Sequence, residues 1–257
     1  MTVSRLMKSV MVLASAVAFL ALWGDQAGAA SRVKPPGYGW AEMERKYEGA
    51  FVLSASRETR KVALTFDDVP DPRFTPDVLD VLRRKRVKAT FFVVGSRARK
   101  YPDLVRRIHR EGHDIGNHSD THPDFSKMSL REVREQIARA ETAIADAVGF
   151  RPRLVRPPYG EILPSQVEWA RRNGFTVVNW DVDSSDWRQL TAVQVFRNVT
   201  RSVKPGSVVL MHAGGGGGQN LRGTVEALPR MIDWLREHDY ELVGLTELLN
   251  QPESRRR

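Results

Sequence analysis

Short apolar runs alternate with helical patterns from Lys61 almost to the end of the chain, and this alternation limits the possible folds more than any other feature. A strand that helices cover on both faces is apolar along its length, because neither face meets water. About seven strand and helix units predict a parallel α/β fold. The expected strands cover Val62 to Phe66, Ala89 to Val94, Asp114 to Asn117, Leu154 to Val155, Phe175 to Trp180, Ser207 to Met211 and Tyr240 to Val243. The expected helices cover Pro76 to Arg86, Tyr101 to Glu111, Leu130 to Val148, Ile162 to Arg172, Ala192 to Val203 and Val225 to His238.

Polar clusters follow five of the apolar runs, at or just beyond the end of each run. The carboxyl ends of parallel strands meet at one rim, so clusters that are distant in the sequence are expected to form one site. Clusters after so many strands favour a barrel, because an open sheet concentrates its site at one switch point. The clusters are Asp67-Asp68, His118-Ser-Asp-Thr-His122, Arg156-Pro-Pro-Tyr159, Asp183-Ser-Ser-Asp186-Trp187 and Leu210-Met-His212.

Residues 1–29 have the pattern of a secretory signal peptide. Arg5 and Lys8 precede an apolar stretch from Val10 to Trp23, and Ala27-Gly28-Ala29 supplies the small residues of a cleavage site. The stretch is shorter than the ~20 residues of a membrane span, so cleavage is favoured over the alternative of an uncleaved anchor. We therefore expect a secreted or cell-wall-associated protein with no stable membrane span after cleavage.

Composition limits the partners and the metal ligands. The 257 residues, 41% of them hydrophobic, suit one sizeable domain or two small ones. The net charge of +9 falls to +8 without Arg5, Lys8 and Asp25, and this charge either attracts anionic cell-wall polymers or serves solubility. Nucleic acid is a poor partner, because the basic residues are scattered without interleaved aromatics. The chain has no cysteine, so a metal would be held by His, Asp or Glu.

Three segments lie outside the strand and helix pattern. Residues 30–60 contain Pro35-Pro36-Gly37 and are interpreted as a linker or an N-terminal arm. Residues 250–257 form a basic tail that ends in three arginines. Gly214 to Gly218 lacks the Lys-Ser/Thr ending of a phosphate-binding loop. We interpret it as a flexible loop that either lets a substrate approach His212 or is disordered.

His118 and His122 are four residues apart, a spacing at which two imidazoles can bind one metal ion. Pro123 disfavours helix at His122, so we place both on a loop. Two surface histidines at this spacing are also common by chance. Asp68 favours the metal hypothesis, because two His and one carboxylate leave coordination positions open for water and substrate.

Asp67 stands beside Asp68 and becomes a candidate general base if Asp68 binds a metal. An adjacent Asp pair also opens turns, which is the alternative. Arg156 precedes two prolines that fix the backbone, so its guanidinium can be directed at Asp67. The alternative is a turn with Arg156 on the surface. Tyr159, after Pro158, offers a backbone N–H that could stabilise an oxyanion.

One carboxylate of Asp183 and Asp186 could orient His212. Trp187 would then form a wall of a sugar or acyl pocket, or it belongs to the core. The remaining histidines lie in or beside helical patterns and are interpreted as ordinary surface residues. They are His109, His113 and His238.

The polar clusters together resemble the five ordered motifs of the polysaccharide deacetylases, carbohydrate esterase family 4 with its NodB homology domain. The resemblance covers residues 61–249 as one catalytic domain and implies a distorted, incomplete (β/α) barrel with about seven parallel strands. The motifs in this chain are Thr65-Phe-Asp-Asp-Val-Pro70, His118-Ser-Asp-Thr-His-Pro123, Arg156-Pro-Pro-Tyr-Gly160, Asp183-Ser-Ser-Asp-Trp187 and Leu210-Met-His212.

The resemblance implies a role for most of these polar residues. A divalent metal, usually zinc, is expected on Asp68, His118 and His122, with cobalt, nickel or iron also suited to the ligands. Asp67 is implied as the base positioned by Arg156, and His212 as the acid tuned by Asp183. The Tyr159 N–H is implied in the oxyanion hole, and Trp187, Tyr159 and Pro158 are the expected substrate contacts.

Two residues depart from the family pattern. Val69 stands where glycine is usual, so the backbone there is expected to be ordinary or the loop reshaped, because β-branched residues disfavour positive φ. Ala213 stands where an Asp commonly follows the final His. Neither change removes a proposed ligand or proton-transfer group, so an active enzyme is expected.

The expected reaction is hydrolysis of N-acetyl groups on an amino-sugar polysaccharide, peptidoglycan or a chitin-like oligomer, with release of acetate. The alternatives are an O-acetyl esterase acting on acetylated xylan and a non-catalytic cell-wall-binding protein. A glycosidase that uses two of the carboxylates is a further alternative, but it leaves the two histidines unexplained.

Overall fold

A nine-stranded sheet forms the centre of the computed structural model, which describes residues 39–255. Every ladder between named strands is parallel, in the order β1-β6-β5-β4-β3-β2-β8-β7, with β9 pairing β2 beside this path. The strands are β1 Phe51–Val52, β2 Lys61–Val69, β3 Thr90–Val93, β4 Asp114–Asn117, β5 Leu154–Val155, β6 Thr176–Val178, β7 Val182–Asp183, β8 Val208–His212 and β9 Glu241–Val243.

The sheet curls without closing within residues 39–255, since β1 and β7 stand at the two ends of its order. This confirms the distorted, incomplete barrel. All seven expected strands are present. Two further strands, β1 and β7, have two residues each and are too short to show a period.

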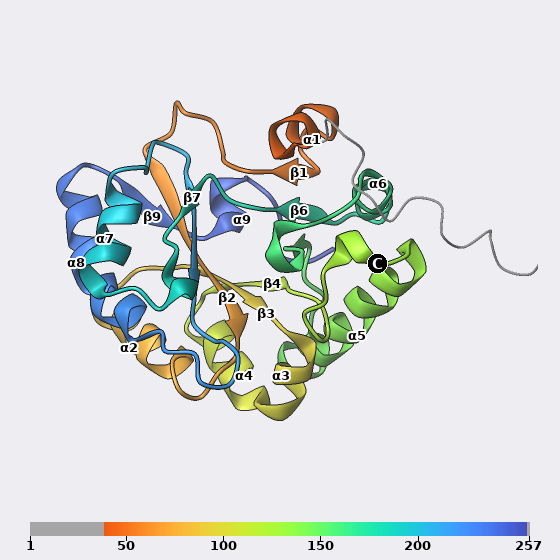
Figure 1. The fold of residues 1–257 in the computed structure, drawn as a ribbon, viewed down its shortest axis with the longest axis horizontal. Helices are drawn as coiled ribbons and strands as arrows, with labels where there is room; N and C mark the ends of the chain where they lie inside the picture. Colours follow the sequence, from red (N-terminus) through yellow and green to blue (C-terminus); the bar gives the residue numbers. More distant parts are fainter. Residues whose placement is uncertain (1–38, 256–257) are drawn as a thin grey trace, which may run out of the picture. The chain divides into compact units, whose positions relative to one another are not determined.

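Helices lie around the outside of the curled sheet (Figure 1). All six expected helices are present, and α5 begins at a capping box in which Ser129 and Glu132 bond reciprocally. The sequence did not predict α1, α3 and α9, which have only seven, six and four residues. The helices are α1 Trp40–Lys46, α2 Thr75–Lys85, α3 Gly95–Lys100, α4 Pro102–Arg110, α5 Leu130–Val148, α6 Pro164–Arg172, α7 Ala192–Thr200, α8 Arg222–Glu237 and α9 Leu245–Leu248, with 3-10 turns η1 Phe125–Lys127, η2 Pro158–Gly160 and η3 Asp186–Arg188.

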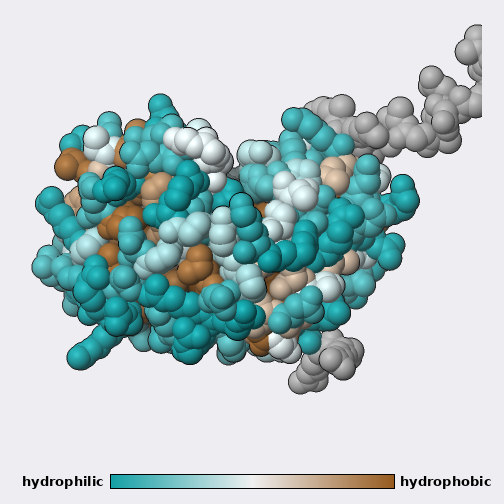
Figure 2. Space-filling view, turned by 90° about the horizontal axis from the view of Figure 1, so that it is seen from below, coloured by the Kyte–Doolittle hydropathy of each residue, from teal (hydrophilic) through white to brown (hydrophobic). Residues whose placement is uncertain are grey.

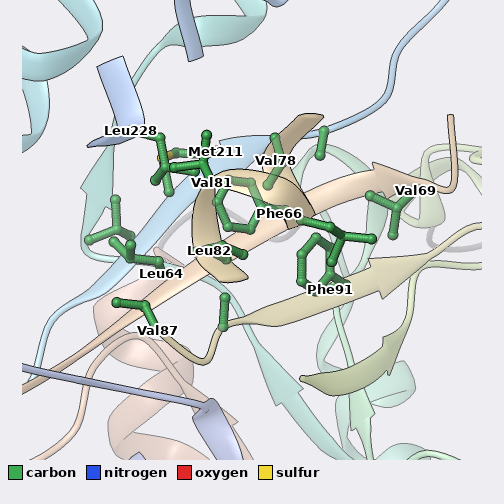
Figure 3. Packing of buried hydrophobic residues seen from close by; sticks show 14 of the residues in the cluster. Leu64, Phe66, Val69, Val78, Val81, Leu82, Val87, Phe91, Met211 and Leu228 are labelled. Carbon is green, nitrogen blue, oxygen red and sulfur yellow. The ribbon is translucent and has the colours of Figure 1, made fainter. Parts of the chain in front are cut away.

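Strand β2 separates the main core from the interior of the curl. Val62, Leu64 and Phe66 pack in a buried cluster with residues of α2 and α8 (Figure 3). Side chains alternate along a strand, so Thr65 and Asp67 point to the opposite face. The same alternation that builds the core therefore delivers Asp67 to the inner face, where the polar clusters meet.

The ends of the chain lie partly outside the described residues. The expected signal peptide, residues 1–29, lies wholly outside them. From residue 39 the expected linker contains α1 and β1, and β1 pairs with β6. In the expected basic tail, Arg255 forms an ion pair with Glu141 and covers the ring of Phe175. Across residues 39–255, no helix combines the length and apolar character that a membrane crossing requires.

Candidate active site

Four polar clusters lie at the carboxyl ends of neighbouring strands. Asp67 at the end of β2 is the ladder partner of His212 at the end of β8. His118 directly follows β4, and Arg156 directly follows β5. In Figure 1 the arrow of β2 points toward the lower edge of the view, and Figure 2 shows the face seen from that side. The parallel ladders therefore gather these residues at one rim.

Asp68, His118 and His122 present ligand atoms that all lie within 4.8 Å of one another. Asp68 Oδ1 is 3.2 Å from His122 Nε2 and 3.7 Å from His118 Nε2. A break in the β2–β3 register falls between Phe66 and Val69, and Asp68 has the positive φ of 64°. This local change of backbone lets Asp68 reach the histidines although it adjoins Asp67.

The buried imidazole of His118 is held in one tautomer. Its Nδ1 lies 2.7 Å from the carbonyl oxygen of Arg156. A carbonyl only accepts, so Nδ1 carries the proton and Nε2 keeps its lone pair toward Asp68. Burial lowers the pKa of His118 to about 3, and the neighbouring His122 acts in the same direction. A neutral imidazole with this orientation is the form that binds metals.

Hydrogen bonds connect the loop that carries the two histidines to α5 and also join residues within the loop. His122 N donates to Ser119 Oγ, and Ser119 N donates to Asn117 Oδ1. Gln136 of α5 accepts from the backbone of the same loop. Ser119 and His122 both have positive φ, near 66° and 62°. The pair therefore lies on a loop, as Pro123 predicts.

Arg156 is fully buried and donates to Asp67. Its Nη1 lies 2.8 Å from Asp67 Oδ1 and 2.8 Å from Thr65 Oγ1, while Nε and Nη2 donate to carbonyl oxygens of β6 and the residue after it. The guanidinium also covers the ring of Phe92 at 4.1 Å. Together these contacts hold the guanidinium in one orientation. Asp67 is therefore oriented by a hydrogen bond from a positively charged group. The alternative of a surface arginine is wrong.

Asp186, not Asp183, contacts His212. Asp186 Oδ1 lies 2.8 Å from His212 Nδ1, and Oδ2 accepts from the backbone N–H of His212 and from Thr224 Oγ1. Asp183 Oδ1 instead accepts from Ser185 N. Asp183 still belongs to β7, whereas Ser185 has a left-handed backbone with φ of 54° that turns the chain back toward β8. The prediction that Asp183 tunes His212 is therefore corrected to Asp186.

The Asp186 carboxylate favours the protonated form of His212. Burial alone lowers the pKa of His212, but the charge and hydrogen bond of Asp186, together with the charges of Asp67 and Asp68, raise it to about 9. The pKa of Asp186 is correspondingly lowered: burial opposes this, and the charge of His212 prevails. His212 thus carries a proton at neutral pH.

Two aromatic side chains are exposed near the polar residues. The Tyr159 ring is 63% exposed and meets the ring of His122 edge-on at 4.8 Å between centroids. Tyr159 has a φ of 59°, and Pro158 before it is buried. Trp187 in η3 is 51% exposed, so the alternative of a core position is wrong.

The two departures from the family motifs are accommodated. Val69 has no positive φ, which lies one residue earlier, at Asp68, although the peptide bond from Val69 to Pro70 is cis. Ala213 is buried, and its carbonyl accepts a hydrogen bond from Thr75. In the glycine loop, residues 214–215 are buried and residues 216–218 are exposed, so only part of the loop is open to solvent.

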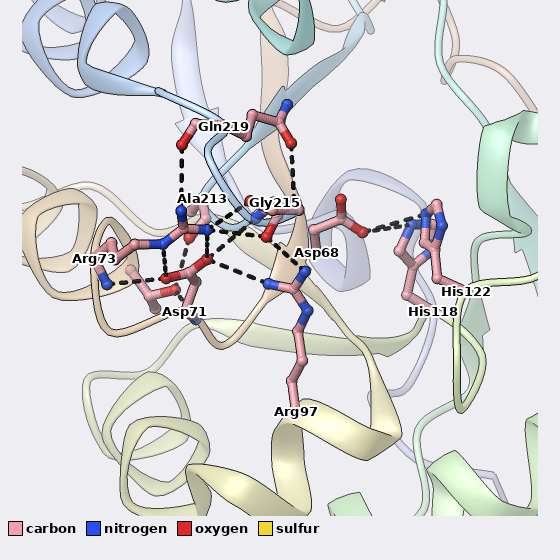
Figure 4. A network of polar contacts seen from close by, with 11 residues as sticks. Asp68, Asp71, Arg73, Arg97, His118, His122, Ala213, Gly215 and Gln219 are labelled. Carbon is pink, nitrogen blue, oxygen red and sulfur yellow. Dashed lines mark hydrogen bonds and ion pairs between the residues drawn. The ribbon is translucent and has the colours of Figure 1, made fainter.

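Several residues of this region carried no signal in the sequence. Thr224 of α8, which helps to hold Asp186, is one of them. The others are Asp71, Arg73 and Arg97, which contact one another and the glycine loop (Figure 4). The contacts of Arg73 and Arg97 with Gly215 join segments more than 100 residues apart, and no local pattern reports such a pairing.

Proteins of known function resemble this chain in sequence. The sequence profile of the polysaccharide deacetylases matches residues 54–178. A peptidoglycan-N-acetylglucosamine deacetylase of Bacillus cereus is 41% identical over 219 residues, which cover 85% of this chain and 77% of that protein. A chitooligosaccharide deacetylase of a Bradyrhizobium species is 38% identical over 199 residues, 74% of this chain and 91% of that protein.

Solved structures agree with this result. A peptidoglycan N-acetylglucosamine deacetylase bound to a substituted N-oxidanyl-benzamide has a TM-score of 0.81 and 40% identity, covering 84% of this chain and 99% of the other. A pseudoenzyme of carbohydrate esterase family 4 from Bacillus anthracis has a TM-score of 0.73 and 30% identity, covering 81% and 71%. Fold, motif order and sequence identity together show that the chain belongs to the polysaccharide deacetylase family.

Proposed function

We propose that this chain is a metal-dependent hydrolase that removes N-acetyl groups from peptidoglycan or a related amino-sugar polymer. The observation that carries the proposal is the placement of two oriented proton-transfer groups beside one ligand set. Asp67 is paired with a buried arginine, and its ladder partner His212 is paired with a buried carboxylate. An acid and a base held in different environments are the arrangement that amide hydrolysis requires.

The ligand set of Asp68, His118 and His122 fits a divalent cation. Its donors are two imidazole nitrogens and one carboxylate oxygen, and the His118 lone pair is already directed by the Arg156 carbonyl. This mixed set suits zinc best, with cobalt, nickel and iron as further candidates. When bound, such an ion polarises the acetyl carbonyl and makes water more acidic.

Asp67 is assigned the role of general base. Its Oδ1 is occupied by the guanidinium of Arg156, so Oδ2 is the oxygen left to accept a proton. Oδ2 is directed toward the ligand set, 3.6 Å from His118 Nε2. The hydrogen bond from Arg156 holds the Asp67 carboxylate in this rotation.

His212 is assigned the role of general acid. Its Nδ1–H donates to Asp186, so Nε2–H is the proton available to a departing amine. An amine leaves poorly without a proton, which is why an N-deacetylase needs this group. The backbone N–H of Tyr159 is proposed to stabilise the oxyanion of the tetrahedral intermediate.

A sugar polymer suits the surface around these residues. Tyr159 and Trp187 expose apolar rings, which pack against the faces of pyranose rings, whereas Pro158 is buried. Figure 2 shows a mostly hydrophilic face with hydrophobic patches between the polar residues. The relatives named for peptidoglycan and chitooligosaccharide substrates support the same class. Export through residues 1–29 would bring the enzyme to the cell wall.

The test is acetate release from peptidoglycan, from chitin oligomers and from acetylated xylan, each with zinc supplied and again after chelation. Metal-dependent release from peptidoglycan or from chitin oligomers is expected, with Asp67→Asn as the inactive control. Release only from acetylated xylan would instead identify an O-acetyl esterase.

A non-catalytic wall-binding function is the second candidate, because a pseudoenzyme shares this fold. Binding to walls without acetate release, and unaffected by His118→Ala, would establish it.

A further inference from the structure

Two arginines converge on a buried carboxylate behind the candidate metal ligands (Figure 4). Arg73 Nη2 lies 2.6 Å from Asp71 Oδ2, and Arg97 Nη1 lies 3.3 Å from the same oxygen. Burial raises the pKa of Asp71, but hydrogen bonds from Arg73 and Gly215 outweigh it and lower the pKa. Asp71 is therefore ionised, and its charge is neutralised inside the protein. We name Asp71, Arg73 and Arg97 the clamp.

The clamp holds the first part of the glycine loop. Arg97 Nη2 donates to Gly215 O at 2.8 Å, and Arg73 Nη2 donates to Gly215 O at 3.0 Å and to Gly216 O at 3.1 Å. In return, Gly215 N donates to Asp71 Oδ2 at 3.3 Å. Charged groups thus satisfy the backbone of a segment that has no side chains of its own to pack.

The clamped loop lies directly against the backbone of Asp68. A Cβ on Gly214 would stand 1.9 Å from the carbonyl oxygen of Asp68, so only glycine permits this approach. Asp68 itself has the left-handed φ of 64°, which a residue with a side chain keeps only where its surroundings impose it. The loop is part of those surroundings.

A second connection leads from the clamp to the residue after His212. Asp71 N donates to Thr75 Oγ1, and Thr75 Oγ1 donates to Ala213 O, both at 2.8 Å. Ala213 N in turn donates to Asp67 O. The clamp is therefore joined to both ends of the site, at β2 and at β8.

We propose that the clamp holds the glycine loop against the backbone of Asp68 and so fixes the Asp68 carboxylate in the position needed for metal binding. The inference rests on the proposed metal-dependent function. Asp71 acts through Asp68, because its own carboxylate is engaged by the two arginines and lies outside the three-residue ligand set. Residues that orient a metal ligand typically change metal affinity by about 10–100-fold when they are lost.

The test compares Asp71→Asn with Asp80→Asn. Asp80 on α2 also receives two arginines, Arg107 at 2.6 Å and Arg83 at 3.3 Å, but it belongs to the α2–α4 surface. Zinc dissociation constants are measured by competition with a chromophoric chelator, and unfolding midpoints are measured on the metal-free proteins. We expect Asp71→Asn to weaken zinc binding by about 10-fold or more. Asp80→Asn is expected to stay within about twofold of the unmodified chain, since it changes no contact of Asp68.

Arg97→Met and Arg97→Lys keep the test decisive if Asp71→Asn does not fold. Methionine removes the bonds to Gly215 and Asp71, whereas lysine keeps the charge and can remake one bond. The expected order of zinc affinity is unmodified chain, Arg97→Lys, Arg97→Met. Unchanged zinc affinity in a folded Asp71→Asn or Arg97→Met protein overturns the clamp alone. Failure of the unmodified chain to bind zinc overturns the proposed function itself, and with it the inference.

Discussion

Asp67 and His212 face each other as ladder partners across β2 and β8, and each is held by a charged residue that comes from elsewhere in the chain. Arg156 holds Asp67 at 2.8 Å, and Asp186 holds His212 at 2.8 Å. The arginine places a positive charge beside Asp67, and the aspartate favours the protonated imidazole of His212. One ladder position thus places an assigned base beside a guanidinium and an assigned acid beside a carboxylate.

Asp67→Asn is expected to lower kcat by about 10²–10⁴-fold, because an amide cannot accept the proton. Zinc affinity is expected to change far less than kcat, since Asp67 is not one of the proposed ligands. The protein also loses about 3 kcal/mol of stability, because Arg156 keeps a buried charge without its counter-ion. Single-turnover acetate release, a zinc titration and a thermal melt measure the three effects separately. Full activity of the variant would remove Asp67 from the proposed mechanism.

Asp186→Asn and Asp183→Asn form a matched pair that separates the observed contact from the sequence-based assignment. Loss of the Asp186 charge lowers the pKa of His212, so the alkaline limb of the pH–rate profile is expected to move to lower pH. The value of kcat at neutral pH should fall by about 10-fold or more, while Asp183→Asn should change it by less than about twofold. Equal profiles for the two variants would contradict the role of Asp186.

The sequence could predict the elements that have enough residues to show a period. Leu130–Val148 appears with the same bounds in the structure because its apolar spacing and its cap agree. The two-residue strand β7 gives no such pattern, although it determines where Asp183 lies. Short length accounts for the missed elements, although β5, which also has two residues, was expected.

Motif order predicted which segments gather at the rim. It did not predict which of two nearby carboxylates contacts His212. Asp183 and Asp186 belong to one cluster, and the left-handed backbone of Ser185 decides between them. The clamp was not predicted, because the contact of Asp71 with Gly215 joins two loops and leaves no trace in local spacing.

His113 is buried, so its interpretation as a surface residue is wrong, and it is expected to make stability depend on pH. Burial lowers its pKa to about 4, and the charges of Lys88 and Arg107 act in the same direction. Between pH 6.5 and about 4, the unfolded chain binds a proton that folded His113 does not, so stability is full above pH 6.5 and falls as the pH decreases. The loss approaches about 3 kcal/mol.

His113→Asn is the variant that checks this, because asparagine can still accept the hydrogen bond from Ala89 N. Chemical denaturation at a series of pH values should show a shallower decline between pH 6.5 and 4 for the variant than for the unmodified chain. The same decline in both proteins would mean that other groups cause it.

Trp187→Ala is expected to weaken the binding of sugar oligomers with little effect on folding. Trp187 is 51% exposed, so its removal leaves no cavity in the core. Loss of one aromatic contact should cost about 1 kcal/mol, which corresponds to a rise in KM of about fivefold with kcat nearly unchanged. Val193→Ala, at another exposed apolar position, is the control, and its KM should not change. A drop in kcat without a change in KM would instead place the Trp187 indole among the groups that act in the transition state.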